Sequence, residues 1–121
     1  MKICYIAGPY RGKSKIGIIN KFQVIHNIIR ARKVAKELWK QGYAAICPHS
    51  NTALFDGVVP DQDFLDGDIE ILRRCDLIVM IPGWRRSTGA LSELRVAQRW
   101  NIKAYYWDSQ AREIVALTDC K

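Results

Sequence analysis

Apolar residues along this 121-residue chain follow two alternating patterns. Four short, nearly continuous apolar runs are found at residues 2–7, 43–47, 77–81 and 102–107. Such runs are typical of strands that are buried on both faces of a parallel sheet. Between and after them, apolar residues recur at helical spacing. This spacing predicts helices over residues 20–42, 62–74, 88–100 and 108–117.

Residues with special backbone roles mark several boundaries of these elements. Asn20 can cap the first helix, and Gly42 can end it in a left-handed conformation. Pro82 ends the third apolar run, and either Ser87 or Thr88 can cap the helix that follows. The pattern and its boundaries therefore agree.

The alternation of strands and helices predicts a three-layer α/β/α domain. Its centre would be a parallel sheet of four to five strands, of the flavodoxin-like or Rossmann-like kind. Residues 1–121 have the size of one domain, and no repeat or linker divides them. Residues 50–60 are expected to be irregular, either as a plain surface loop or as a cover over a site.

The composition, with 49% hydrophobic and 26% charged residues, is that of an ordinary globular protein. No apolar run approaches the roughly 20 residues of a membrane span, and the first residues lack a signal-peptide layout. We therefore expect a cytoplasmic protein without a membrane partner. Four cysteines without a C-x-x-C pair, and only two histidines, predict no disulfide framework and no metal site. No organic cofactor is implied either.

Charge is distributed unevenly along the chain, whose net charge is +7. Residues 11–40 hold nine basic residues and one acid, whereas residues 56–76 hold seven of the twelve acids. Such asymmetry suits a phosphorylated small molecule or a nucleic acid, although a solvated basic helix face gives the same composition. Nucleic acid is the less favoured partner, because the basic residues lie mainly on one helix without a recognised binding motif.

The loop after the first strand has the composition of a phosphate-binding loop. Gly8 and Gly12 allow the backbone to approach a ligand, and Arg11 and Lys13 supply positive charge. Its Gly-Lys-Ser ending is similar to a Walker A motif, but that motif needs a glycine five residues before Gly12, where Ala7 stands. A P-loop nucleotidase is therefore disfavoured.

Glu93 is the first candidate for chemistry. It falls about one turn inside the helix that follows the 77–81 strand, beside the crevice where open α/β sheets bind ligands. The start of the same helix offers free N–H donors to an anion. The alternative is a glutamate that only complements the helix dipole.

Three groups of residues together resemble the nucleoside 2-deoxyribosyltransferase superfamily. They are the 5–12 segment Tyr-Ile-Ala-Gly-Pro-Tyr-Arg-Gly, Asp68 eight residues before Asp76, and the 87–93 segment Ser-Thr-Gly-Ala-Leu-Ser-Glu. The chain looks most like the small nucleoside 5′-monophosphate N-glycosidases and short phage and bacterial relatives of unassigned function. The resemblance implies hydrolysis or transfer at the N-glycosidic bond of a (deoxy)nucleoside 5′-monophosphate, and a homodimer or higher homo-oligomer.

This resemblance assigns catalytic roles to three residues. Glu93 matches the nucleophile, Asp68 the acid that assists departure of the base, and Tyr5 the tyrosine that orients the nucleophile. Glycosidic cleavage does need a carboxylate and a proton donor. The helix start and nearby cations are expected to keep Glu93 ionised, and Asp68, if it is the more buried, to be protonated.

The resemblance also implies a set of substrate-binding positions. They are Gly8, Pro9, Tyr10, Arg11, Gly12, His49, Trp84, Ser87 and Gly89. The glycines, Arg11 and Ser87 match positions that hold a 5′-phosphate, and His49 follows a strand at which relatives contact the base. Trp84 could stack on a base, or it could belong to an exposed rim or a subunit contact.

A binding module is the alternative function, because similar folds also hold nucleotides or ADP-ribose-like signals without cleaving them. The combination of Tyr5, Asp68 and Glu93 favours catalysis. A protein that only binds an anionic ligand would gain nothing from two convergent carboxylates.

Overall fold

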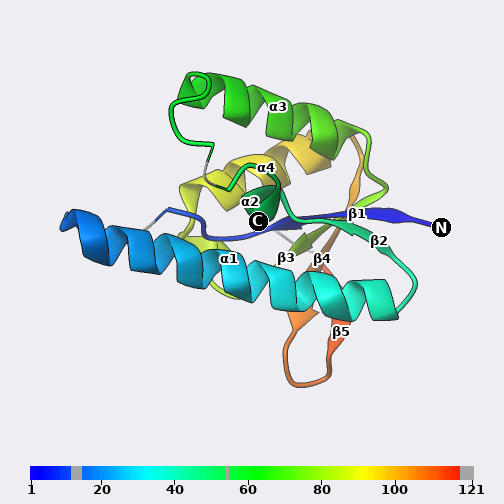
Figure 1. Ribbon diagram of the computed structural model, residues 1–121. Coiled ribbons are helices and arrows are strands. Elements are labelled where there is room, and N and C mark those ends of the chain that lie inside the picture. The colour runs from blue at the N-terminus through cyan, green and yellow to red at the C-terminus, as the bar shows by residue number, and fades with distance from the viewer. Residues whose placement is uncertain (12–14, 54, 118–121) are drawn as a thin grey trace.

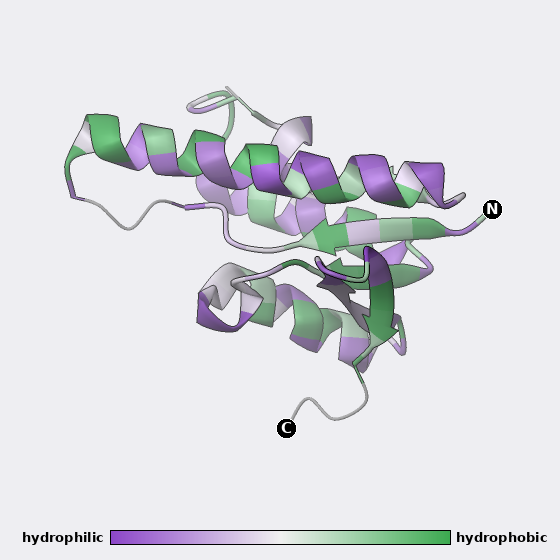
Figure 2. Cartoon of the chain, turned by 90° about the horizontal axis from the view of Figure 1, so that it is seen from below, coloured by the Kyte–Doolittle hydropathy of each residue, from purple (hydrophilic) through white to green (hydrophobic). Residues whose placement is uncertain are grey.

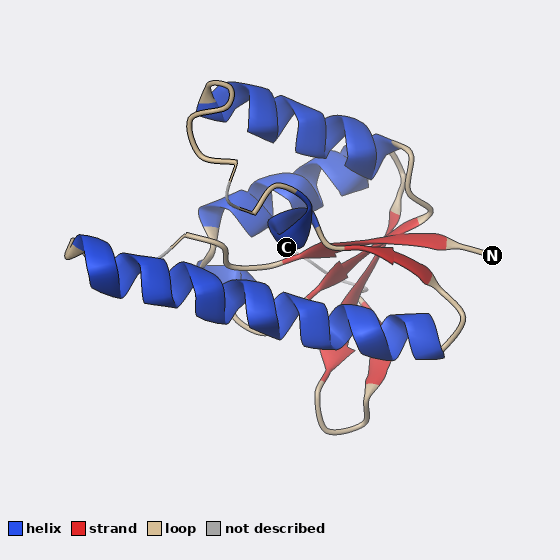
Figure 3. Cartoon of the chain, in the orientation of Figure 1, coloured by secondary structure: helices blue, strands red, loops and turns tan. Residues whose placement is uncertain are grey.

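The computed structural model describes residues 1–11, 15–53 and 55–117, which form one sheet between helices (Figures 1 and 3). The elements in chain order are β1 (Ile3–Ala7), α1 (Gly17–Lys40), β2 (Ala44–Ile46), α2 (Pro48–Asn51), α3 (Asp61–Arg73), β3 (Leu77–Met80), the 3-10 helix η1 (Trp84–Arg86), α4 (Thr88–Arg99), β4 (Lys103–Asp108) and β5 (Glu113–Ala116). None of the helices in these ranges combines the length and apolar character needed to cross a membrane.

The sheet has five strands in the order β2-β1-β3-β4-β5. The first four in this order are parallel, and β5 is antiparallel to β4. The central strand β3 is buried along its whole length, as its continuous apolar sequence predicts. The predicted α/β class is therefore confirmed, with a sheet that is mixed at one edge.

Helices cover both faces of the sheet and divide the core into two parts. Successive residues of β1 point to opposite faces, because side chains alternate along a strand. Cys4 and Ile6 pack in the core beneath α1, whereas Tyr5 and Ala7 pack in the core beneath α3 and α4. This alternation places the Tyr5 side chain on the face that carries α4.

The prediction of a terminal helix over residues 108–117 was wrong. The segment turns after β4 and returns as β5. The Asp108 carboxylate accepts hydrogen bonds from the backbone N–H groups of Gln110 and Ala111, at 3.0 and 3.1 Å, and so stabilises the turn. The β-branched Ile114 and Val115 then suit a half-buried strand better than a helix.

The predicted helix boundaries were partly correct. Gly42 ends α1 with φ of 93°, and its N–H donates to the carbonyl of Trp39, as expected for a left-handed C-terminal residue. Ser87 caps α4 by accepting a hydrogen bond from the N–H of Ala90 at 3.2 Å. By contrast, α1 begins before Asn20 and has no side-chain cap.

Candidate active site

Tyr5 and Glu93 are 88 positions apart in the sequence and meet in the structure. Tyr5 lies on β1, between β2 and β3 in the sheet, and Glu93 lies on α4, which packs on the face to which Tyr5 points. The Tyr5 hydroxyl donates a hydrogen bond to a carboxylate oxygen of Glu93. Because the tyrosine side chain is fully buried, this bond holds the Glu93 carboxyl group in one place.

Asp68 completes a group of three ionisable side chains. It lies on α3, which packs beside α4, and its side chain is half-buried. Its charge raises the pKa values of both Glu93 and Tyr5, so the two carboxyl groups are near enough to interact. The structure therefore brings together all three residues that the sequence analysis predicted as catalytic.

Burial is the main influence on both carboxyl groups. It raises the pKa of Glu93 to about 7, an effect that the Tyr5 hydrogen bond opposes and the Asp68 charge reinforces. Burial also raises the pKa of Asp68 to about 6. Neither carboxylate has an ion pair within the described ranges. Burial thus favours the protonated form of both carboxyl groups, contrary to the expectation that the helix start keeps Glu93 ionised.

These pKa shifts predict that Glu93→Gln stabilises the fold at pH 8. A raised native pKa means that the native state binds the proton more tightly, so the stability of the wild type falls as pH rises from about 4.5 to about 7. The shift is equivalent to about 3 kcal/mol. Glutamine stays neutral and can still accept from Tyr5. Urea unfolding should show the gain at pH 8 and little difference near pH 4.

The exposed Glu113 is the matched control for this prediction. Glu113→Gln should leave the free energy of unfolding nearly unchanged at both pH values, because an exposed glutamate keeps its solvation on folding. A gain for Glu93→Gln that is equal at the two pH values would contradict the proposed cause.

The loop after β1 lies tightly against the end of β3. A Cβ atom added to Gly8 would meet the Cγ1 atom of Ile81 at 2.2 Å, so only glycine fits there. Pro9 lies against Gly83, where an added Cβ would be 3.0 Å from the proline ring. The carbonyl of Tyr10 accepts a hydrogen bond from Asn27 of α1 at 3.2 Å. This loop therefore lies at the carboxyl edge of the two central strands.

Asn27 is a contributor that the sequence analysis missed. Its side-chain amide donates to the carbonyl of Tyr10 and so holds the loop. The sequence does contain a signal for it, because Asn27 is a polar residue on a side of the helix that otherwise carries apolar residues. Those residues, Val24, Ile28 and Ala31, are all at least half-buried.

His49 lies in α2, directly after β2, and is 9% exposed. Burial lowers the pKa of His49 to about 4, so the ring is neutral. The Gly8 backbone opposes this lowering of the pKa, and the centroid of the imidazole ring lies 5.0 Å from that of the Tyr10 ring. The Nδ1 atom is buried without a partner in the described part of the chain. A buried polar atom of this kind can be satisfied by a bound molecule.

The structure brings only some of the predicted phosphate-binding residues close together. Arg11 is exposed and makes an ion pair with Asp61 at 3.8 Å, a surface contact of little energetic weight. Ser87 and Gly89 lie together at the start of α4, and an added Cβ at Gly89 would meet only the Ser87 hydroxyl, at 3.9 Å. Gly12 lies outside the described residues.

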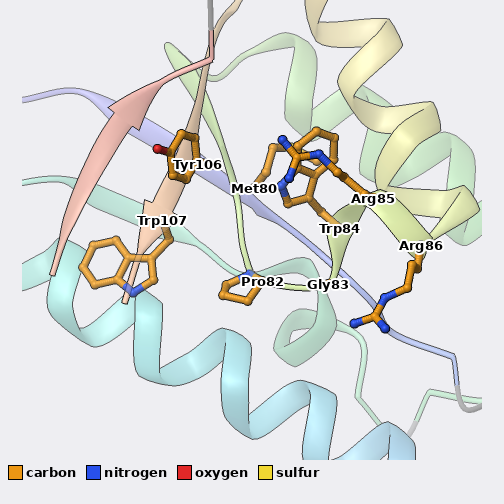
Figure 4. Close-up of a pocket in the computed structure, with 8 residues that line it drawn as sticks. All are labelled: Met80, Pro82, Gly83, Trp84, Arg85, Arg86, Tyr106 and Trp107. Atoms are coloured by element: carbon orange, nitrogen blue, oxygen red, sulfur yellow. The ribbon is translucent and has the colours of Figure 1, made fainter. Parts of the chain in front are cut away.

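Trp84 is buried in the same core cluster as Tyr5. Its indole ring is 7% exposed, and the Arg85 guanidinium lies over it at 4.7 Å. A cavity of about 420 Å³ at the ends of β3 and β4 is lined by Met80, Pro82, Gly83, Trp84, Arg85, Arg86, Tyr106 and Trp107 (Figure 4). Tyr5, Asp68 and Glu93 do not line it. A role of Trp84 in substrate binding stays a prediction.

No group of three histidine, cysteine, aspartate or glutamate side chains within the described ranges is placed to hold a metal ion. The cysteines Cys4, Cys47 and Cys75 are free. Burial raises the pKa of Cys4 to about 12 and that of Cys75 to about 11, so both thiols are protonated at neutral pH. The ionisable side chains that the structure brings together at this site are the two carboxyl groups and the tyrosine.

The mostly parallel sheet with helices on both faces defines a doubly wound α/β protein, in which a buried tyrosine contacts a glutamate. A family model described as "Domain of unknown function (DUF4406)" matches residues 1–106. The chain belongs to this family. No curated protein matches it.

Solved structures of two 2-deoxyribosyltransferases are similar to this chain. One, from the psychrotolerant bacterium Bacillus psychrosaccharolyticus, is 15% identical with a TM-score of 0.59, over 87% of this chain and 71% of that chain. The other, from Leishmania mexicana, is 15% identical with a TM-score of 0.53, over 97% of this chain and 80% of that chain. At this identity the likeness shows a shared fold. It supports the predicted superfamily at the level of fold, and the nearer likeness to monophosphate N-glycosidases stays a prediction.

Proposed function

We propose that this protein cleaves the N-glycosidic bond of a nucleoside or deoxynucleoside 5′-monophosphate, by hydrolysis or by transfer of the sugar to a second base. The observation that carries the proposal is the buried hydrogen bond from Tyr5 to Glu93, with Asp68 beside it. A glycosidase acts through two carboxyl groups. Here two carboxyl groups with raised pKa values lie at the ligand-binding edge of an α/β sheet. The shared fold of the two 2-deoxyribosyltransferases adds support.

In the first step, the Glu93 carboxylate attacks the anomeric carbon of the sugar and the bond to the base nitrogen breaks. Asp68 transfers its proton to the departing base, which leaves neutral. The product is a glycosyl ester on Glu93 together with an Asp68 carboxylate. In the second step, Asp68 takes a proton from water, or from a second base, as that molecule attacks the anomeric carbon and releases Glu93.

Tyr5 supports this sequence as a positioning residue. Burial and the two carboxylates strongly raise its pKa, so the hydroxyl keeps its proton and remains a donor. The donated hydrogen bond stabilises the carboxylate form of Glu93. It also directs one Glu93 oxygen toward the tyrosine, so the other oxygen is the one available for attack.

The proposal places the 5′-phosphate at the start of α4. Ser87 and Gly89 lie there, about one turn from Glu93, and helix starts present N–H donors to anions. Arg11 can exchange its exposed ion pair with Asp61 for the phosphate at small cost.

The base is proposed to contact His49. The unpartnered Nδ1 atom would then gain a hydrogen bond, and the adjoining Tyr10 ring offers an aromatic surface. We further propose that the protein acts in the cytoplasm as a homo-oligomer.

Release of free base from a panel of ribo- and deoxyribonucleoside 5′-monophosphates, and from the matching unphosphorylated nucleosides, tests the proposal. We expect release from at least one monophosphate, with a lower kcat/KM for its nucleoside because the phosphate contacts are lost. Binding of nucleotides without any release, at protein concentrations that allow single turnover, would instead support the binding module. Release of base from nucleosides but from none of the monophosphates would contradict the proposed phosphate site.

A further inference from the structure

The N-terminal half of α1 projects beyond the carboxyl edge of the sheet (Figure 1), and several of its residues are hydrophobic (Figure 2). Ile18, Phe22, Ile25 and Ile29 have exposed fractions of 65%, 66%, 52% and 49%. Their spacing of four, three and four residues places them on one side of the helix, as in a coiled-coil seam. We call these four residues the α1 stripe.

The same side of α1 changes character after Ile29. The spacing continues through Lys33, Lys36 and Lys40, which are all exposed. The opposite side of this half packs on the sheet through buried residues such as Val34 and Leu38. The C-terminal half therefore has an ordinary solvated outer face, and the apolar outer face of the N-terminal half is an exception that needs a partner.

We propose that the α1 stripe packs antiparallel against the α1 stripe of a second copy of this chain. The spacing of the stripe is the same in both directions, which a twofold contact between identical surfaces requires. A twofold axis opposite residues 23 and 24 pairs Ile18 with Ile29 of the second copy, and Phe22 with Ile25 of the second copy. Each apolar side chain then has an apolar partner.

The distribution of charge favours this direction over a parallel pair. In a parallel pair, Lys33, Lys36 and Lys40 of the two chains would lie side by side and repel one another. In the antiparallel pair, the basic halves extend in opposite directions from the axis. With a rise of 1.5 Å per residue, the two Lys36 residues lie about 40 Å apart along the helices. That separation is several times the Debye length of about 8 Å in physiological salt.

The available area fits a weak, reversible dimer. The α1 stripe together with Ile19, which is 44% exposed, presents roughly 500 Å² of apolar side chain, if a fully exposed side chain of this size has about 200 Å². A symmetric pair would therefore bury about 1,000 Å², near the lower limit for specific interfaces. This inference does not depend on the proposed chemistry.

Sedimentation equilibrium of Phe22→Glu, with Trp39→Glu as the matched control, tests the surface. Trp39 is an aromatic residue on the same helix, is 54% exposed and lies outside the α1 stripe. We expect wild type and Trp39→Glu to form dimers that dissociate on dilution, and Phe22→Glu to be at least tenfold weaker in dimerisation. A wild type that is monomeric at several hundred micromolar, or dimers unchanged in Phe22→Glu, would overturn the proposal.

Disulfide trapping tests the direction of the helices in a background with Cys47→Ser and Cys120→Ser. The double variant Ile18→Cys, Ile29→Cys should give a covalent dimer on mild oxidation, and each single variant should give little. Cross-linking by the single variants would indicate a parallel pair and contradict the proposal. Circular dichroism of every variant should match the wild type, because Ile18, Phe22, Ile29 and Trp39 are each about half-exposed or more.

Discussion

Glu93→Gln is expected to lower kcat for base release by about a thousandfold or more, while the fold is retained. Glutamine keeps the size of the side chain and can accept the hydrogen bond from Tyr5, but it cannot form the glycosyl ester. Because Glu93→Gln is also expected to raise the free energy of unfolding at pH 8, the variant should be both more stable than the wild type and inactive. A loss of activity could then not be explained by unfolding. The measurement is single-turnover base release, with unfolding monitored on the same preparation.

Chemical rescue separates a nucleophile from a residue that only shapes the pocket. Glu93→Ala leaves space beneath the sugar, and added formate or azide should restore measurable turnover by attacking the anomeric carbon. Glu113→Gln, at an exposed strand position, should match wild type throughout. Activity of Glu93→Gln within tenfold of wild type would refute the assigned role.

Asp68→Asn is expected to have the second largest effect, a loss of about 10²–10⁴-fold in kcat, because general acid catalysis contributes that much. The loss should depend on the base. A substrate whose base departs without protonation, such as an N7-methylated guanine nucleotide, should lose little. The matched control is Asp66→Asn, two positions away on α3, where the exposed carboxylate accepts a hydrogen bond from Gln62 at 2.8 Å.

The pH dependence gives an independent readout of the same residue. Glu93 must be ionised and Asp68 protonated, and their pKa values are about 7 and about 6. The wild-type rate should therefore rise and then fall with pH, with apparent pKa values that belong to the coupled pair. Asp68→Asn should lose the alkaline fall and keep the acidic rise. An unchanged profile would remove Asp68 as the acid, since ionisation of the substrate is common to both proteins.

Much of the fold was predictable because its signals are local. The apolar run at residues 77–81 marked the buried strand β3, and Ser87 and Gly42 marked helix boundaries that the structure retains. For residues 108–117, the local signals predicted the wrong element. Their apolar residues are compatible with either helix or strand, and the side chain of Asp108 together with an available sheet edge decided the outcome.

The candidate site was predictable as a set of residues but not as an arrangement. The short motifs around Tyr5, Asp68 and Glu93 identified these three through the family resemblance, and the structure places them together. The order of their acidities was predicted only on the condition that Asp68 is the more buried. That order depends on how deeply each carboxyl group is buried, which no local pattern reports.

The sequence by itself determined the positions of most strands and helices, the uneven charge and the identities of the reactive side chains, because periodicity, capping and composition act over a few residues. Only the tertiary structure decided that Tyr5 donates a hydrogen bond to Glu93, that the buried Nδ1 of His49 has no partner among the described residues, and that the α1 stripe stays exposed. Each of these depends on strand order and helix packing, which join residues far apart in the chain. Burial and partners, rather than residue type, then set the pKa values on which the proposed reaction depends.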